Sequence, residues 1–416
     1  MQTRQGDNRV KLLAMSQYFW PESFSINDVV RSLKVRGIDV TFLTGKPNYP
    51  DGNVFVGYRA WGCQRESWQG IPVLRVPLAP RGRNSAVGLA ANYLSFIFSV
   101  MMFGPWLLRK KRFDAILVYC PSPLLQALSA LYLGRIKGAP VIVWVQDLWP
   151  ESLESTGYVK NRLVLDLVRK LVQFLYRRTH HILISSRSFA APISAMAPGA
   201  KISYLPNSID SSFSAPDSAP RTPMPALDEG FCVVFAGNIG AAQAMEVIVG
   251  AASQLTAYPE IRFVIIGSGS RHEWMQREVR DRGLANVHLV GRYPGEAMPY
   301  LLSKAGALLV TLADRPIFAA TVPNKVQAYL AVGRPVVGCL NGEGARLIEE
   351  AGAGMTVQAE DADGLAQAIL TLYRMTPEAR KEMGDNGRLF YRQNFDHEQL
   401  VDRLVGLIQD TVREYR

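Results

Sequence analysis

A lysine near the start of an expected helix is the residue best suited to hold a negatively charged ligand. The helix is expected within residues 318–337, which read FAATVPNKVQAYLAVGRPVV. Pro323 suits the first helical position, where no backbone N–H is needed, and Gly333 suits the position after the last turn. Free N–H groups, the helix dipole and the Lys325 ammonium would then converge on one anion, such as a phosphate. The alternative is an ordinary loop–helix–strand unit with a solvated lysine.

Glycine-containing loops follow several expected strands in the second half of the chain. Glycine lets backbone N–H groups close on a phosphate, so repeated glycine loops after successive strands predict a phosphate site better than one loop does. The loops are Gly237-Asn238-Ile239-Gly240, Gly267-Ser268-Gly269 and Gly291-Arg292.

Two carboxylates follow an expected buried strand, residues 141–146, in the first half of the chain. In doubly wound sheets, ligands lie beyond the carboxyl ends of the strands. Asp147 and Glu151 are therefore placed where chemistry is expected. The alternative for Asp147 is that it caps the next helix.

The order of residues around these sites resembles retaining glycosyltransferases of the GT-B fold, glycosyltransferase family four. Residues 323–337 resemble the family segment P-S-K-x-x-E-Y-x-A-x-G-x-P-V-V, which lines the nucleotide-sugar site. GNIG with Gln243 resembles the loop that contacts the donor pyrophosphate. QDLWPESL resembles a signature of the subgroup that builds bacterial surface polysaccharides, such as O-antigen, capsule or colanic acid.

The sequence departs from the family pattern at two positions that commonly carry glutamates, where it has Ala320 and Ala328. Gln327 is adjacent to Ala328, but one helical step turns it by roughly 100°. Asn238 and Gln243 occupy the loop in which many members carry an arginine and a lysine. Lys325 is the cation that best matches its motif.

The resemblance implies catalysis without a bound metal. Lys325 and backbone N–H groups would hold the charge that develops on the leaving nucleotide diphosphate. Asp147 would orient the acceptor hydroxyl or stabilise the cationic sugar. The residues implied to bind the donor are Gly237, Asn238, Gly240, Gln243, Gly267, Gly269, Arg292, Pro323, Asn324, Lys325 and Gln327.

Two loops of the first half, YFWPESFSIND and TGKPNYPDG, resemble loops that border the acceptor cleft in these enzymes. The spacing of Ser25 and Asp28 also fits a capping box at a helix start, which would explain both residues without a ligand. The residues implied to bind the acceptor are Ser25, Asn27, Asp28, Asn48 and Glu151.

The chain has 416 residues, and 46 Lys and Arg against 36 Asp and Glu give a net charge of +10. This balance favours an anionic partner, such as nucleic acid, acidic lipid or a phosphorylated substrate. No nucleic-acid partner is expected, because no basic strip interleaved with aromatic residues is evident. The four cysteines lack metal-ligand spacing and predict thiols in a reducing compartment. Without an apolar signal segment at the start, a cytoplasmic protein is expected.

Two series of alternating strands and helices predict an α/β fold with two Rossmann-like domains. The resemblance implies the GT-B architecture, with a cleft between the domains. Residues 1–207 would form the acceptor- and membrane-facing domain, and residues 208–390 the nucleotide-sugar domain. Residues 391–416 would form a C-terminal helix that packs back on the first domain.

Residues 84–108 contain no charged side chain and are long enough for a transmembrane helix. Crossing would separate strands that should share one sheet. Arg81 and Arg83 precede the run and residues 109–112 add four cations after it, which favours a helix lying in one leaflet. Residues 161–178 predict a second basic amphipathic helix. The expected location of the protein is the inner face of the cytoplasmic membrane. The alternative for residues 84–108 is a fully buried core helix.

The resemblance implies a retaining enzyme of hexosyl or N-acetylhexosaminyl type. Its donor would be a nucleotide sugar, with UDP expected, and no other cofactor. Its acceptor would be a polyprenyl-diphosphate-linked saccharide of a surface polysaccharide. Loss of both motif glutamates motivates the alternative of a non-catalytic nucleotide-sugar or lipid-binding subunit. A nucleotide-sugar epimerase shares the fold, but no feature favours it.

Overall fold

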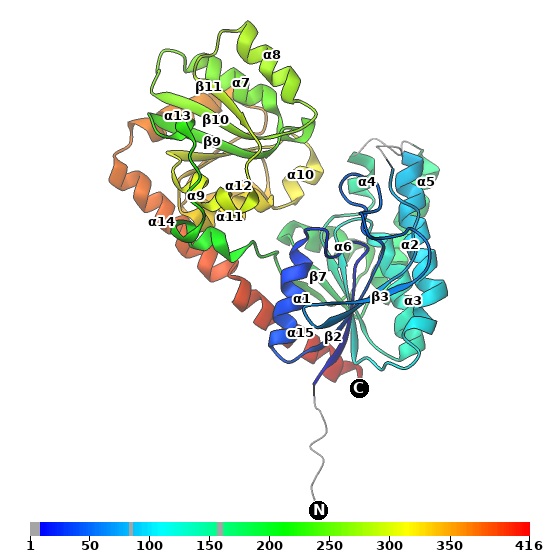
Figure 1. Cartoon of the computed structure of the whole chain (residues 1–416). Coiled ribbons are helices and arrows are strands. Elements are labelled where there is room, and N and C mark those ends of the chain that lie inside the picture. Colours follow the sequence, from blue (N-terminus) through cyan, green and yellow to red (C-terminus); the bar gives the residue numbers. More distant parts are fainter. Residues whose placement is uncertain (1–8, 83–85, 156–160) are drawn as a thin grey trace, which may run out of the picture. The chain divides into compact units, whose positions relative to one another are not determined.

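The computed structural model describes residues 9–82, 86–155 and 161–416, which form two compact units (Figure 1). Unit 1 comprises the described chain up to Pro206 together with Glu398–Arg416, and unit 2 comprises Asn207–His397. Arg83, expected to flank the long apolar run, lies outside the described residues.

Unit 1 is built on an eight-stranded sheet with the order β3-β4-β2-β1-β5-β6-β7-β8. Neighbouring strands pair in parallel except for β3 and β4. Every residue of β5 and β6 is buried, as expected for a parallel sheet covered on both faces. The strands are β1 (Lys11–Met15), β2 (Asp39–Thr44), β3 (Gln64–Trp68), β4 (Ile71–Arg75), β5 (Ala115–Cys120), β6 (Val141–Val145), β7 (His181–Ile184) and β8 (Ile202–Tyr204).

Helices cover both faces of this sheet (Figure 1). The first and last helices of the unit share one core with one face of the sheet, and α2, α3 and α5 cover the other. The helices of unit 1 are α1 (Ser25–Val35), α2 (Ala86–Leu107), α3 (Ala127–Lys137), α4 (Glu151–Ser155), α5 (Arg162–Arg178), α6 (Ala190–Met196) and α15 (His397–Tyr415).

Unit 2 contains a six-stranded sheet, parallel throughout, with the order β11-β10-β9-β12-β13-β14. The strand order reverses between β9 and β12, so a ligand is expected beyond the carboxyl ends of these two strands. The strands are β9 (Phe231–Asn238), β10 (Ile261–Ser268), β11 (Val287–Gly291), β12 (Ala307–Thr311), β13 (Val336–Cys339) and β14 (Gly354–Val357).

Two apolar clusters cover the two faces of the unit 2 sheet. Both units are thus Rossmann-like α/β layers, and the predicted fold class is confirmed for each. The helices of unit 2 are α7 (Met245–Gln254), α8 (His272–Asp281), α9 (Met298–Ser303), α10 (Pro316–Ala320), α11 (Asn324–Val332), α12 (Glu343–Glu350), α13 (Ala362–Arg374) and α14 (Pro377–Asn394).

The boundary predicted at residue 391 is wrong, because that residue lies inside α14. Tyr391 and Phe395 pack into the core of unit 2, which keeps the chain in that unit past the predicted point. The chain joins unit 1 from Glu398 onwards. There Leu404 and Ile408 of α15 pack into the unit 1 core, and Thr411 is hydrogen-bonded to His181 at 2.9 Å.

Helix α2 has apolar side chains on two sides. Phe96 and Val100 are completely buried, whereas Leu94, Phe98 and Met102 are 61%, 62% and 54% exposed. By length and composition, residues 87–107 qualify as a membrane-crossing helix, and 28% of an 18-residue window within them is buried. The alternative of a fully buried core helix is therefore contradicted.

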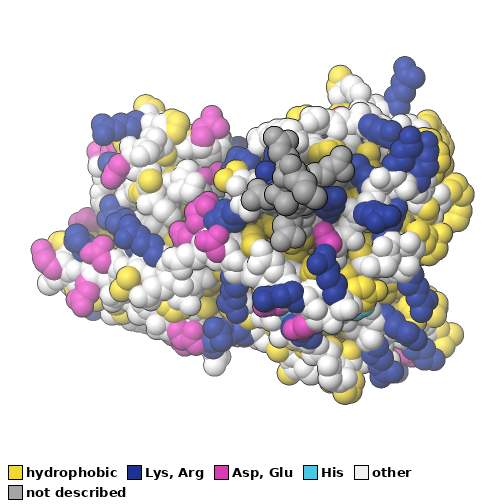
Figure 2. Space-filling view, turned by 90° about the horizontal axis from the view of Figure 1, so that it is seen from below, with side chains coloured by type: hydrophobic (Ala, Val, Ile, Leu, Met, Phe, Trp, Pro, Cys, Tyr) yellow, Lys and Arg dark blue, Asp and Glu magenta, His cyan; other side chains and the backbone are white. Residues whose placement is uncertain are grey.

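Helix α5 shows the same division. Leu165, Val168 and Val172 pack inward, while other apolar side chains remain exposed. Hydrophobic side chains gather at the right-hand edge of Figure 2, with Lys and Arg side chains around them. We call the exposed apolar residues of both helices the outer apolar surface; they are Val87, Leu94, Phe98, Met102, Trp106, Leu163, Val164, Leu167 and Phe174.

Candidate active site

The Lys325 ammonium lies at the carboxyl ends of the unit 2 strands, in the first turn of α11. It donates a hydrogen bond to Gln243 Oε1 at 2.6 Å and lies 3.7 Å from the ring centroid of Phe235. Tyr329 anchors the same helix to β9, because its hydroxyl oxygen accepts the backbone N–H of Ala236 at 3.0 Å. Burial lowers the pKa of the Lys325 ammonium to about 7, since desolvation penalises the charged form.

Two glycines make room for this lysine. A Cβ at Gly237 would meet Lys325 Cε at 2.7 Å, and a Cβ at Gly267 would meet the Gly237 carbonyl oxygen at 1.8 Å. Both have a positive φ, of 140° and 144°, which other residues rarely adopt. The loops after β9 and β10 therefore pack backbone to backbone next to Lys325.

The other residues predicted for donor binding surround these loops. Gly240 precedes a short turn that ends at Gln243, and the Gln243 carbonyl accepts the Thr311 hydroxyl at 2.5 Å. Asn238 and Arg292 are exposed, and Arg292 Nε donates to Ser268 Oγ. This contact joins the loops after β10 and β11, where Gly269 also lies.

Two details of helix α11 bear on the predicted donor contacts. Pro323 is not the first helical residue: its backbone is extended, with ψ of 134°, and the helix begins at Asn324, which is exposed. Gln327 is buried, and its Nε2 donates to the backbone carbonyl of Asn207 at 2.9 Å. Gln327 therefore fixes the start of unit 2 to α11 through its Nε2, and its contact with the donor stays a prediction.

The two positions that commonly carry glutamate in the family contribute no charge here. Ala320 ends α10, and Ala328 belongs to the apolar core of unit 2. Carboxylates at these positions are thus replaced by small apolar side chains.

Asp147 lies directly after β6 in unit 1. Burial raises the pKa of its carboxyl to about 6. The hydroxyls of Tyr119 and Ser25 are hydrogen-bonded to each other at 2.8 Å. The Asp147 charge reaches the phenols of Tyr119 and Tyr93, whose pKa values are raised mainly by burial and further by this charge. We call Asp147, Tyr93, Tyr119 and Ser25 the Asp147 cluster.

The capping-box interpretation of Ser25 and Asp28 is wrong. The N-cap of α1 is Phe24, and it makes no side-chain capping bond. Ser25 is the first helical residue and turns its hydroxyl to Tyr119. Asp28 instead forms an exposed ion pair with Arg31 at 2.9 Å. The acceptor contacts expected of Ser25 and Asp28 stay predictions.

Two predicted acceptor residues instead hold the loops after β1 and β2. Asn27 accepts the backbone N–H of Trp20 at 3.2 Å and donates to the Glu22 carbonyl at 2.7 Å. Asn48 is fully buried and donates to the Lys46 carbonyl at 3.0 Å. Because Asn48 has no exposed surface, we correct its expected acceptor contact to a structural support. The acceptor contact of Asn27, which is partly exposed, stays a prediction.

Glu22 joins these two loops, and sequence reasoning missed it. Its carboxylate accepts the backbone N–H groups of Phe19, Asn48 and Tyr49 at 3.2, 2.8 and 2.8 Å. A buried acid bonded in this way closes the loops over the carboxyl ends of β1 and β2. The one signal for it was an acidic residue among aromatic and proline neighbours.

Glu151, the remaining acceptor candidate, begins α4.

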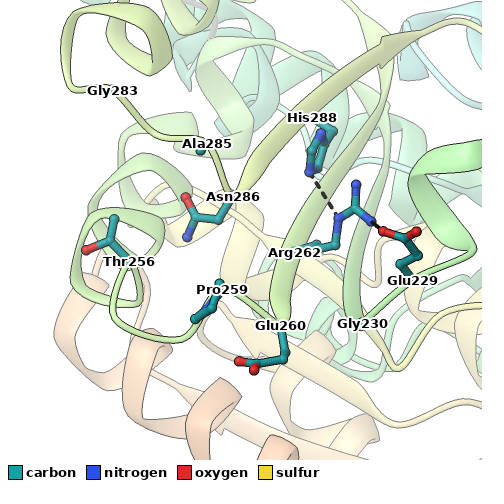
Figure 3. A pocket seen from close by; sticks show the side chains of 10 residues that line it. All are labelled: Glu229, Gly230, Thr256, Pro259, Glu260, Arg262, Gly283, Ala285, Asn286 and His288. Carbon is teal, nitrogen blue, oxygen red and sulfur yellow. Dashed lines mark hydrogen bonds and ion pairs between the residues drawn. The ribbon is translucent and has the colours of Figure 1, made fainter.

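A separate hollow of about 600 Å³ lies at the amino ends of β9, β10 and β11 (Figure 3). Arg262 crosses it, pairing with Glu229 at 3.4 Å and donating to His288 Nε2 at 3.2 Å. These charges satisfy one another, and the hollow is at the opposite strand ends from Lys325. The phosphate-site pattern belongs to the Lys325 end.

Comparisons with known proteins agree with this arrangement. Residues 24–208 match the model of the glycosyl transferase 4-like domain, and residues 230–375 match that of glycosyl transferases group 1. The chain is 25% identical over 342 residues to the "Putative colanic acid biosynthesis glycosyl transferase WcaI" of Escherichia coli, covering 78% of this chain and 82% of that protein. It is 23% identical over 347 residues to the "Probable glycosyltransferase WbjE" of Pseudomonas aeruginosa, covering 82% and 84%.

Solved structures share the fold over nearly the whole chain. The sucrose-phosphate synthase of Thermosynechococcus elongatus has a TM-score of 0.72 at 16% identity, covering 97% of this chain and 99% of that one. HepE of Anabaena, solved in complex with UDP and glucose, has a TM-score of 0.66 at 13% identity, covering 97% and 100%. The fold class is that of the GT-B glycosyltransferases. The two glycosyltransferase domain models together match most of the chain's length.

Replacing Asp147 by Asn should stabilise the protein at pH 8. The folded-state pKa of Asp147 lies above its usual value, so its ionisation costs stability as the pH rises through about 6. The gain is on the order of 3 kcal/mol at pH 8 and shrinks as the pH falls from 6 towards 4. Urea unfolding at several pH values measures it. Asp28→Asn is the exposed control, and a gain that does not vary with pH would refute the buried-carboxyl interpretation.

Lys325 should make UDP binding weaken with rising pH. Only the protonated ammonium pairs with a diphosphate, so affinity should fall by about tenfold per pH unit above 7. Calorimetric titration between pH 7.5 and 9 avoids the ionisation of UDP itself. Lys325→Arg should remove this dependence because arginine stays charged. Equal pH dependence in both proteins would contradict the assignment.

Proposed function

We propose that this protein is a retaining glycosyltransferase that moves a sugar from a UDP-linked donor to a polyprenyl-diphosphate-linked saccharide during bacterial surface-polysaccharide synthesis. The observation that carries the proposal is the half-buried Lys325 ammonium among glycine loops at the switch point of unit 2. The name of the Escherichia coli relative, which mentions colanic acid, supports the pathway, and the UDP complex of HepE supports the nucleotide.

Lys325 addresses the main physical difficulty of sugar transfer. Breaking the anomeric C–O bond leaves negative charge on the nucleotide diphosphate and positive charge on the sugar. A preorganised hydrogen-bond donor directed at such negative charge stabilises the transition state by roughly 3–4 kcal/mol. A diphosphate next to Lys325 would raise the pKa of the ammonium and keep it protonated. With this cation and the loop N–H groups in place, the proposed chemistry is independent of metal.

Asp147 serves the acceptor in this proposal. Retention by same-face attack lets the leaving phosphate accept the acceptor's proton, so no strong protein base is needed. A carboxyl with a pKa of about 6 is ionised at neutral pH. It can therefore accept a hydrogen bond from the attacking hydroxyl of a hexose or an N-acetylhexosamine, or stabilise the cationic sugar.

The outer apolar surface supports docking on the inner face of the cytoplasmic membrane. Arg109 and Arg65 both lie over the Trp106 ring, 5.2 and 5.7 Å from its centroid. Arg178 lies 5.7 Å from the Phe174 ring centroid on α5. Exposed apolar groups edged by cations fit a helix that lies at a lipid surface, with its charges on phosphates.

The sheet of unit 1 supports docking rather than crossing. Helix α2 connects β4 to β5, and β4 joins the sheet through β2 while β5 pairs with β1. Since β1 also pairs with β2, both ends of α2 lead into one sheet. A membrane-crossing α2 would require this sheet to be divided between two compartments.

Lys325→Ala should reduce turnover by about 100-fold or more with the fold intact, because it removes the cation at the leaving diphosphate. The assay incubates UDP-sugars with extracted lipid-linked acceptors and follows UDP release. Lys304→Ala removes an exposed lysine of the same unit and should leave turnover unchanged. Turnover of Lys325→Ala within about threefold of wild type would refute the role of Lys325. The alternative of a non-catalytic subunit predicts no transfer by the wild type or by Lys325→Ala.

Replacing Leu94, Phe98 and Met102 together by Ser should release the protein from vesicles that contain anionic phospholipid. These side chains are exposed, so their loss removes apolar contact with lipid without a core cavity. Activity on a lipid-linked acceptor should fall while activity on a soluble analogue survives. Flotation with vesicles measures binding, and high salt should weaken it only in part because the apolar contribution is not screened.

The matched control replaces Val35 and Leu389, exposed apolar residues on α1 and α14, by Ser. This control should bind vesicles like the wild type. Docking is contradicted if the wild type stays in solution with anionic vesicles at low salt. Cleavage of the residues before α2 only from the far side of a sealed membrane would instead establish a crossing helix.

A further inference from the structure

A short segment of unit 1, residues 79–81, runs along the side of α2 and carries Arg81; we call this segment the strap. Asn92 Nδ2 donates to the Ala79 carbonyl at 2.7 Å, and Ser95 Oγ accepts the Ala79 N–H at 2.9 Å. Asn48 Oδ1 accepts the Arg81 N–H at 3.2 Å. Asn92 and Ser95 of the largely apolar helix α2, together with the buried Asn48, thus fix the backbone from which Arg81 projects.

The Arg81 guanidinium faces aromatic side chains. It lies 5.6 Å from the ring centroid of Tyr49. That ring packs with Tyr18 and Phe24, at centroid distances of 5.6 and 5.3 Å. Within the ranges that the structure describes, Arg81 forms no ion pair with a carboxylate. Arg75 differs, because its buried guanidinium is occupied by Glu66 at 2.6 Å.

Arg81 lies close to the Asp147 cluster. The phenol of Tyr93, on α2, interacts with both charged groups. Burial raises the pKa of this phenol, the Arg81 charge lowers the pKa, and the Asp147 charge raises it. The next residue along α2, Leu94, belongs to the outer apolar surface. A path therefore runs from the outer apolar surface past Arg81 to the Asp147 carboxyl, all within unit 1.

We propose that Arg81 binds the diphosphate that joins the acceptor saccharide to its lipid. This inference rests on the proposed function and adds the group that recognises the acceptor's linkage. The lipid would lie on the outer apolar surface, the diphosphate at Arg81 and the sugar against Tyr49 and Asp147. The planar guanidinium donates two parallel hydrogen bonds to phosphate oxygens, which an ammonium cannot reproduce.

The test compares the binding of farnesyl diphosphate and farnesol in neutral detergent, by titration calorimetry in the presence of saturating UDP. The two probes share one chain and differ in the diphosphate. The wild type should prefer the diphosphate by about tenfold or more. Arg81→Gln should remove that preference while farnesol binding stays unchanged, and Arg81→Lys should restore only part of it.

Arg187→Gln is the matched control, since it removes an exposed arginine of unit 1 that also lies over a tyrosine ring, 4.7 Å from the Tyr204 ring centroid. It should keep the preference for the diphosphate. Arg81→Gln should also keep the melting temperature of the wild type, because the Arg81 contact with Asn48 uses backbone N–H. A retained preference in Arg81→Gln overturns the inference. Inorganic pyrophosphate binding as tightly as farnesyl diphosphate overturns the lipid-linked assignment.

UDP binding separates this inference from the proposed function. If Arg81→Gln keeps both UDP affinity and the diphosphate preference, only the role of Arg81 is wrong. If the wild type fails to bind UDP and UDP-sugars, the proposed function is wrong as well. Normal UDP affinity together with a lost diphosphate preference supports both.

Discussion

Each unit carries a charged group that is mostly shielded from water, Lys325 in unit 2 and Asp147 in unit 1. Burial disfavours both charges and moves their pKa values towards neutrality. Each therefore gains from a substrate that supplies the missing partner: a diphosphate for the ammonium and a hydroxyl donor for the carboxylate. The glycine loops, the aromatic side chains and the helices on both faces of the sheets all limit the access of water to these two groups. The fold thus holds them in surroundings that solvate their charges less well than water does, and a bound substrate would supply the missing interaction.

Local order in the sequence was sufficient to predict the sheets and the Lys325 end of unit 2. Apolar strands, glycine loops and a helix start are each readable within a few residues, and the pattern repeats along the chain. The same information could not place Asn48, Asn27 or Gln327. Their amides pair with groups that are distant along the chain or depend on loop closure, such as Asn207 for Gln327. The end of unit 2 was also misplaced, because the burial of Tyr391 in a core cannot be read from helical periodicity.

Helix α2 shows why composition alone gave two conflicting expectations. An uncharged helix can be buried in a protein or in a lipid surface, and α2 divides its apolar residues between an inner and an outer side. Asn92 and Ser95 then have a specific use, since they hold the strap that carries Arg81. A buried polar residue in an apolar helix is thus informative about tertiary contacts even when the helix as a whole looks featureless.

The return of the chain to unit 1 through α15 affects the order in which the protein can be completed. Ribosomes add residues in sequence, so the part of the unit 1 core contributed by Leu404 and Ile408 appears only after all of Asn207–His397 has been made. Until then one face of the unit 1 sheet lacks its last cover. Until α15 is made, that face is open to aggregation. A chain whose synthesis stops anywhere in unit 2 also leaves unit 1 unfinished.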